Sequence, residues 1–121
     1  MKNSLIIMLL ILFISCKNDK ARETSPKNAR NKVELGQELF EGKGNCIACH
    51  LVDKKVIGPS IQDIAKIYKT QNGSLVDFLK NDAKPIVDPS QYELMKTNFS
   101  ITKAMSDEEL EALEAYIYSF L

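Results

Sequence analysis

The chain has 121 residues, enough for one domain, and 16 basic residues balance 16 acidic ones to a formal net charge of zero. A neutral chain is unlike the strongly basic proteins that bind nucleic acid. One His excludes a metal site that takes two His ligands from this chain, and three Cys exclude a scaffold of several disulfides.

Residues 1–15 have the pattern of a secretory signal peptide. Lys2 precedes ten unbroken apolar residues at positions 5–14, fewer than the roughly 20 needed to span a bilayer. Phe13-Ile14-Ser15-Cys16 then resembles the lipobox of bacterial lipoproteins, although Phe13 stands where Leu is usual. The resemblance implies a lipid on Cys16 that would hold the protein at a membrane surface. The alternative is an ordinary signal peptide followed by a structural Cys.

Residues 16–32 are predicted to form a disordered basic tether behind the lipidated Cys16. Positions 17–32 hold six basic and two acidic residues, a charge of +4, with little beyond Ala to bury. Residues 33–121 hold nine Lys and fourteen Asp or Glu, a charge of −5. The net charge of zero is therefore the sum of a basic N-terminal segment and an acidic body. Residues 33–121 form the expected domain.

The body is predicted to be all-α, because no segment alternates apolar and polar residues with period two. Apolar spacing predicts helices at 33–41 and 61–68, with Ser74 beginning a third helix and a turn of helix at 92–96. Ser106 with Glu109 has the form of a capping box for the last helix. That helix carries the apolar residues Leu110, Leu113, Ile117 and Leu121, and its acidic residues are expected to be solvated or to steer a basic partner. The acidic residues are Glu108, Glu109, Glu111 and Glu114.

The motif that carries chemistry is Cys46-Ile47-Ala48-Cys49-His50, the C-x-x-C-H form of covalent haem attachment. Two thiols three residues apart can each add to a vinyl group on one edge of the porphyrin. The adjacent His50 is then carried under the iron as its proximal ligand.

Three other uses of these residues compete with haem attachment. A C-x-x-C pair serves thioredoxin-like redox sites, but those sit where a strand meets a helix. A zinc site built on Cys46, Cys49 and His50 lacks a fourth Cys or His in the body. A structural disulfide between Cys46 and Cys49 is possible in an exported chain.

From Gly36 to Leu121 the chain resembles a small bacterial class I cytochrome c. Gly36 and Phe40 match the first-helix contact residues of that family, and Leu113 and Tyr116 match their partners on the last helix. Gly58-Pro59 matches the turn whose Pro59 carbonyl accepts a hydrogen bond from the proximal His. The resemblance implies a cytochrome c fold of short helices packed around one covalently attached haem c.

The resemblance also implies a Met as the second axial ligand, a soft thioether suited to haem iron. Met1 and Met8 lie in the signal segment, which leaves Met95 and Met105. Met95 lies where the family places its ligand, although Lys96 follows it where short family members often have Pro. Met105 directly precedes Ser106, where the family usually has an apolar packing residue. Met95 is the predicted ligand, and Met105 the alternative.

His and Met ligation would leave no iron site for a substrate, which suits a one-electron carrier rather than an enzyme. The alternatives are a haem sensor or peroxidase-like protein with an open iron, and a haem-free thiol redox lipoprotein. We expect an exported monomer on the periplasmic side of a bacterial membrane, held by a lipid and binding no nucleic acid. By family analogy its redox partners would be a respiratory complex, a terminal oxidase or a nitrogen-oxide reductase.

Overall fold

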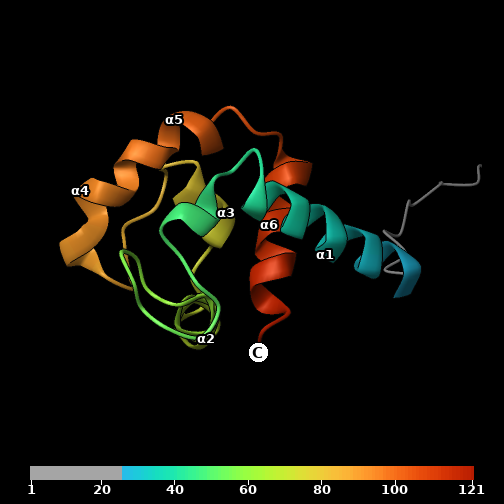
Figure 1. The fold of residues 1–121 in the computed structure, drawn as a ribbon, viewed down its shortest axis with the longest axis horizontal. Coiled ribbons are helices and arrows are strands. Elements are labelled where there is room, and N and C mark those ends of the chain that lie inside the picture. Colours follow the sequence, from blue (N-terminus) through green and yellow to red (C-terminus); the bar gives the residue numbers. More distant parts are fainter. Residues whose placement is uncertain (1–25) are drawn as a thin grey trace, which may run out of the picture.

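The computed structural model describes residues 26–121, and all regular structure in that range is helical (Figure 1). Three one-turn 3-10 helices, η2, η3 and η4, accompany six α-helices. The 3-10 helices are η2 (Cys46–Ala48), η3 (Pro89–Gln91) and η4 (Lys96–Asn98). The α-helices are α1 (Pro26–Glu41), α2 (Ile61–Gln71), α3 (Leu75–Leu79), α4 (Tyr92–Met95), α5 (Phe99–Thr102) and α6 (Asp107–Tyr118).

Serine caps set the starts of three helices. The hydroxyls of Ser60, Ser74 and Ser106 each accept a hydrogen bond from the backbone N–H three residues on. Glu109 accepts a hydrogen bond from the Ser106 backbone N–H in return, which completes the predicted capping box. Asn72 ends α2 in the left-handed conformation, which Asn adopts more readily than most residues.

The helices α1 and α6 cross in close contact. A Cβ placed on Gly36 would lie 2.0 Å from the Ala112 carbonyl oxygen and 2.7 Å from Tyr116 Cβ. One turn further along α1, the rings of Phe40 and Tyr116 pack with centroids 5.4 Å apart. The resemblance predicted this contact, and the two backbones approach so closely because position 36 has no side chain.

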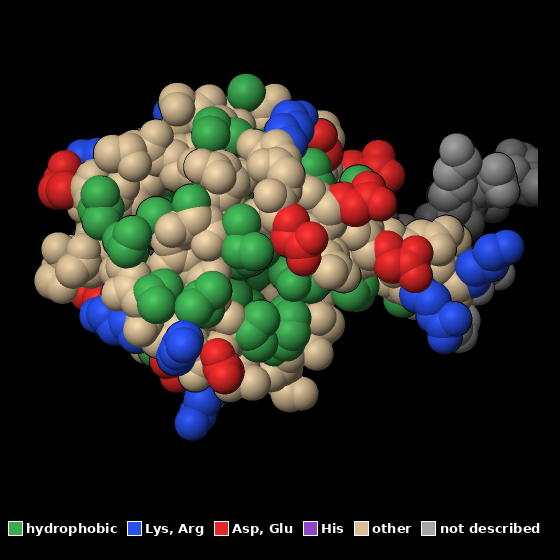
Figure 2. All heavy atoms as spheres, in the orientation of Figure 1, with side chains coloured by type: hydrophobic (Ala, Val, Ile, Leu, Met, Phe, Trp, Pro, Cys, Tyr) green, Lys and Arg blue, Asp and Glu red, His purple; other side chains and the backbone are tan. Residues whose placement is uncertain are grey.

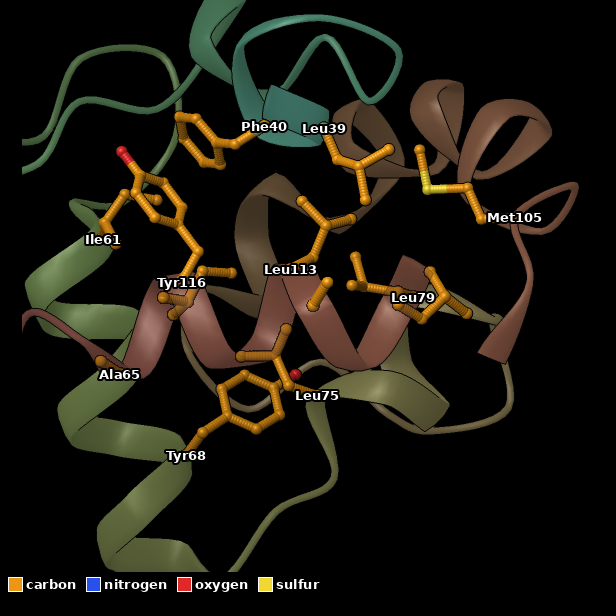
Figure 3. Close-up of a cluster of buried hydrophobic side chains, with 13 residues drawn as sticks. Leu39, Phe40, Ile61, Ala65, Tyr68, Leu75, Leu79, Met105, Leu113 and Tyr116 are labelled. Carbon is orange, nitrogen blue, oxygen red and sulfur yellow. The ribbon is translucent and has the colours of Figure 1, made fainter. Parts of the chain in front are cut away.

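The hydrophobic core fills the space beneath this crossing (Figure 3). Its side chains come from α1, α2, α3 and α6, with Ile61, Leu110 and Leu113 almost fully enclosed. Met105 is also one of these buried core residues. It therefore packs inside the protein, as the family position of an apolar residue implied.

The first helix begins earlier than predicted, because α1 starts at Pro26 rather than at Val33 and so includes residues 26–32. Proline suits the first position of a helix, and the following Ala, Lys and Arg are good helix formers. Lys32 Nζ also lies 2.6 Å from Glu111 Oε2 on α6, which ties this turn to the body. The predicted signal peptide, Cys16 and the rest of the tether lie outside the described residues.

The last helix differs from its prediction at both its end and its acidic face. It ends at Tyr118, so Leu121 is 63% exposed and does not join the core. Glu109 and Glu111 form ion pairs with Lys43 and Lys32, so the acidic face is not simply solvated. Figure 2 shows acidic side chains along the middle of α1 and basic side chains at its N-terminal end. No helix within residues 26–121 is long and apolar enough to cross a bilayer.

Candidate functional site

Cys46 and Cys49 lie at the two ends of one short turn that follows α1. Asn45 adopts the left-handed conformation just before η2, and the Cys49 and His50 N–H groups both donate to the Cys46 carbonyl. Both thiols are free and both line one cleft. The turn therefore brings two thiols and the only imidazole of the chain to the same wall.

His50 is held by the turn that precedes α2. Its Nδ1 lies 2.8 Å from the Pro59 carbonyl oxygen, which is the hydrogen bond that the resemblance implied. Because a carbonyl can only accept, this bond places the proton on Nδ1 and leaves the lone pair of Nε2 free for a metal. A Cβ at Gly58 would lie 2.4 Å from His50 Cε1, so only glycine allows this turn to pack flat on the ring.

The cleft runs between η2, α2, α3 and α4 and is mostly apolar. Its walls include Phe40, Ile61, Ile64, Tyr68, Leu75, Phe78, Leu79, Ile86, Val87, Tyr92 and Leu94, besides Cys46, Cys49, His50 and Pro59. An apolar cleft with a few convergent polar groups is typical of a cofactor site.

Met95 lines this cleft and Met105 does not. Met95 ends the short helix α4 and is half-buried, with η4 following directly. The structure thus brings His50 and Met95, 45 positions apart in the sequence, to the walls of one cavity. Cys16 is the one predicted site residue outside the described range.

Three polar contacts that were not predicted from the sequence hold the Met95 segment in place. Tyr92 donates its hydroxyl to Asn81 Oδ1 at 2.8 Å, and Asn98 Nδ2 donates to the Gly44 carbonyl at 3.0 Å. Thr102, fully buried, donates to the Leu79 carbonyl at 2.7 Å. These bonds join residues 11 to 54 positions apart, so no local sequence pattern could have revealed them.

Comparison with known proteins settles the family. The cytochrome c family model matches residues 33–120. The chain belongs to the cytochrome c family. This cytochrome is 33% identical to cytochrome c-551 of Pseudomonas aeruginosa over 90 residues, which cover 72% of this chain and 78% of that protein. The helical structure of residues 26–121 is therefore the cytochrome c fold.

Shorter matches agree with this assignment. Cytochrome c-551 of Pseudomonas denitrificans is 47% identical over 49 residues, covering 40% of this chain and 57% of that relative. Cytochrome c-552 of Nitrosomonas europaea is 62% identical over 26 residues, covering 22% of this chain and 25% of that relative. The chain thus spans somewhat more than half of the first of these relatives and a quarter of the second.

The cleft fits the haem c that membership of this family implies. Two free thiols, one imidazole with an available Nε2 and one thioether converge on walls that are otherwise mostly apolar. This donor set suits covalent attachment of a porphyrin and axial binding of its iron. The protein carries one covalently attached haem c.

The structure does not support the zinc and dithiol alternatives. Cys46, Cys49 and His50 share one cleft, but within residues 26–121 no three His, Cys, Asp or Glu side chains are grouped so that they could hold one metal ion. Burial raises the pKa of the Cys46 thiol to about 11, whereas a reactive redox thiol needs a lowered pKa. The described part of the chain also has no strand on which a thioredoxin-like site would be built.

Proposed function

We propose that this cytochrome is a one-electron carrier with His50 and Met95 as the axial ligands of its haem iron. Cys46 and Cys49 form the thioether bonds that attach the haem. The observation that carries the proposal is the placement of His50 and Met95 on one cleft while Met105 packs in the core. With both axial positions filled, no iron site is left for a substrate.

The residues around the cleft support electron transfer in two ways. They fix the orientation of His50, and they exclude water from the cleft. When bound, a haem iron supplies a one-electron change between its ferrous and ferric states. Pro59 fixes the Nδ1 proton and the orientation of His50, and Gly58 packs against the ring. The apolar side chains of Ile61, Leu75 and Ile86 keep the cleft dry. A site that keeps its geometry in both oxidation states exchanges an electron with little rearrangement.

The test is carbon monoxide binding to the reduced, purified holoprotein. The wild type is expected to resist carbon monoxide under native conditions and to retain its haem spectrum after denaturation. Met95→Ala is expected to bind carbon monoxide readily, because it opens the iron. Met105→Leu is the matched control and is expected to behave as the wild type.

The open-iron alternative makes the opposite prediction. A haem sensor or peroxidase-like protein would bind carbon monoxide without any substitution at Met95. Rapid binding by the wild type would therefore overturn the carrier proposal. The bond between the Met sulfur and the haem iron is followed by its absorption band, the thioether–iron band. Loss of this band in Met105→Leu, with no change in Met95→Ala, would show that Met105 is the axial ligand.

We also propose that the protein is exported and held at the periplasmic side of a membrane through a lipid on Cys16. Support comes from the apolar run at 5–14 and the lipobox-like residues before Cys16. Its partners are proposed to be membrane-bound or exported redox proteins, such as a respiratory complex, a terminal oxidase or a nitrogen-oxide reductase. Cell fractionation and mass spectrometry of the mature protein test the anchor. Cys16→Ser is expected to move the cytochrome from the membrane to the soluble fraction, and an unlipidated wild type would contradict the proposal.

A further inference from the structure

An ion pair joins two loops that each contribute residues to the cleft wall. Lys55 Nζ lies 2.7 Å from Asp88 Oδ2, and Ser90 donates its hydroxyl to the other carboxylate oxygen. Asp88 also lines the cleft, whereas Lys55 reaches it from outside. The Asp88 side chain is 18% exposed and that of Lys55 is 57% exposed.

The two loops carry the two halves of the haem site. Lys55 lies between His50 and Pro59, on the loop that presents the imidazole. Asp88 precedes η3 and α4, the segment that ends at Met95. Both loops lie on the side of the molecule away from α1 (Figure 1).

We propose that Asp88 and Lys55 set the reduction potential of the haem, Asp88 as a negative charge in the cleft wall and Lys55 as its partial counter-charge. This inference rests on the proposed electron-carrier function. A carboxylate in the wall stabilises the more positive of two oxidation states, since the interaction between charges grows as water is excluded from between them. Asp88 therefore lowers the potential, and Lys55 offsets part of that effect.

The asymmetry of burial makes the carboxylate the dominant charge. Water screens the effect of Lys55 on the cleft more than that of Asp88, because the Lys55 side chain is the more exposed of the two and only Asp88 lines the cleft. Hydrogen bonds from Lys55 and Ser90 hold the pKa of Asp88 below its ordinary value of 3.8, so its charge is present at neutral pH. A pair exposed on one side adds little to stability, so charge is its main expected effect.

The test is a redox titration of the holoprotein for three variants. Asp88→Asn is expected to raise the midpoint potential, and Lys55→Gln to lower it. The double variant is expected to lie between the wild type and Asp88→Asn, because the larger effect of the carboxylate and the smaller, opposite effect of Lys55 are then both absent. Asp53→Asn and Lys54→Gln make the same charge changes on exposed side chains that do not line the cleft. Each control is expected to shift the potential less than half as far as its counterpart.

Two results would overturn the inference. One is a shift of both single variants in the same direction, or by no more than their controls. The other is loss of the thioether–iron band in a single variant, which would mean that the pair holds the Met95 segment in place rather than acting through charge.

A different result would contradict the electron-carrier proposal itself. Carbon monoxide binding by the unsubstituted protein would contradict axial ligation by Met95, whatever the variants do. A wild type that resists carbon monoxide, combined with variants that leave the potential unchanged, would contradict this inference alone.

Discussion

At the scale of single residues, Gly58 controls the proximal side of the haem site. No described glycine has a positive φ, so glycine is required at position 58 for space rather than for backbone conformation. An added Cβ would lie 2.4 Å from Cε1 and 2.7 Å from Nδ1 of His50. Either the imidazole or the turn that carries Pro59 would have to move.

Gly58→Ala is therefore expected to destabilise the holoprotein by about 1–3 kcal/mol, the usual cost of overpacking a filled site. The hydrogen bond from His50 to Pro59 should weaken at the same time. Denaturant unfolding and the reduction potential measure the two effects. Gly73→Ala is the control for the hydrogen bond, because a Cβ there would meet side-chain atoms of Ile86 and Tyr68 and not His50. An equal change of the reduction potential in both variants would contradict this account.

At the scale of elements, the crossing of α1 and α6 depends on the missing side chain of Gly36. Glycine inside a helix costs about 0.5–1 kcal/mol relative to alanine, so alanine would be favoured here if helix propensity decided the outcome. A Cβ at this position would lie 2.0 Å from the Ala112 carbonyl oxygen, which is backbone and has no rotamer by which to move away. Sterics should therefore outweigh propensity.

Gly36→Ala is expected to lower the free energy of unfolding by about 1–3 kcal/mol despite its better helix propensity. The exposed neighbour Gln37 provides the control, and Gln37→Ala should stay within about 0.5 kcal/mol of the wild type. Chemical denaturation of both variants measures the difference. A stabilised Gly36→Ala protein would show that the helices can separate without loss.

The start of α6 gives an element-scale dependence on pH. Lys43 and the Ser106 backbone N–H, in that order, hold the pKa of Glu109 below its ordinary value of 4.5. The folded state thus favours the carboxylate over the acid. This contribution to stability is fully present above the unfolded-state pKa and is lost as the pH falls through the lower folded-state pKa.

Glu109→Gln should keep the capping box but remove this dependence. The wild type is expected to be the more stable protein near neutral pH, with the difference shrinking as the pH falls below about 4.5. Urea unfolding from neutral to acid pH measures it. Glu108→Gln, at an exposed neighbour with no ion pair in the described residues, is the control and should change stability little. A difference that grows toward acid pH would contradict this account.

At the scale of the whole molecule, the haem cleft takes the place of a larger core. Core residues such as Ile61, Tyr68 and Leu75 also line the cleft, so one face of the core is completed only when the cofactor is attached. Small domains rarely bury enough apolar surface to fold without a metal, a cross-link or a cofactor.

The Cys46→Ala, Cys49→Ala double variant, made without attached haem, is therefore expected to be largely unfolded. Far-ultraviolet circular dichroism and thermal melting measure this, with the holoprotein as the reference for a cooperative transition. A cooperative melt from a helical haem-free chain would contradict the prediction.

The sequence alone predicted those parts of the molecule that depend on neighbouring residues. The serine caps at Ser74 and Ser106 and the C-x-x-C-H turn each involve groups a few positions apart, so their chemistry is visible in the sequence. The early start of α1 was missed because composition suggested solvation, although Ser-Pro at positions 25–26 is a recognisable helix start. The Lys55–Asp88 pair and the Asn98–Gly44 bond join distant segments and depend on the packed fold.

The extension of α1 has a consequence for the direction in which electrons leave. Its first seven residues, 26–32, add about 10 Å of rigid rod, and this end lies across the molecule from α4 (Figure 1). If the proposed anchor holds the protein by its N-terminal side, Met95 faces away from the lipid. A membrane-bound partner would then have to reach the α4 side of the protein from the aqueous compartment.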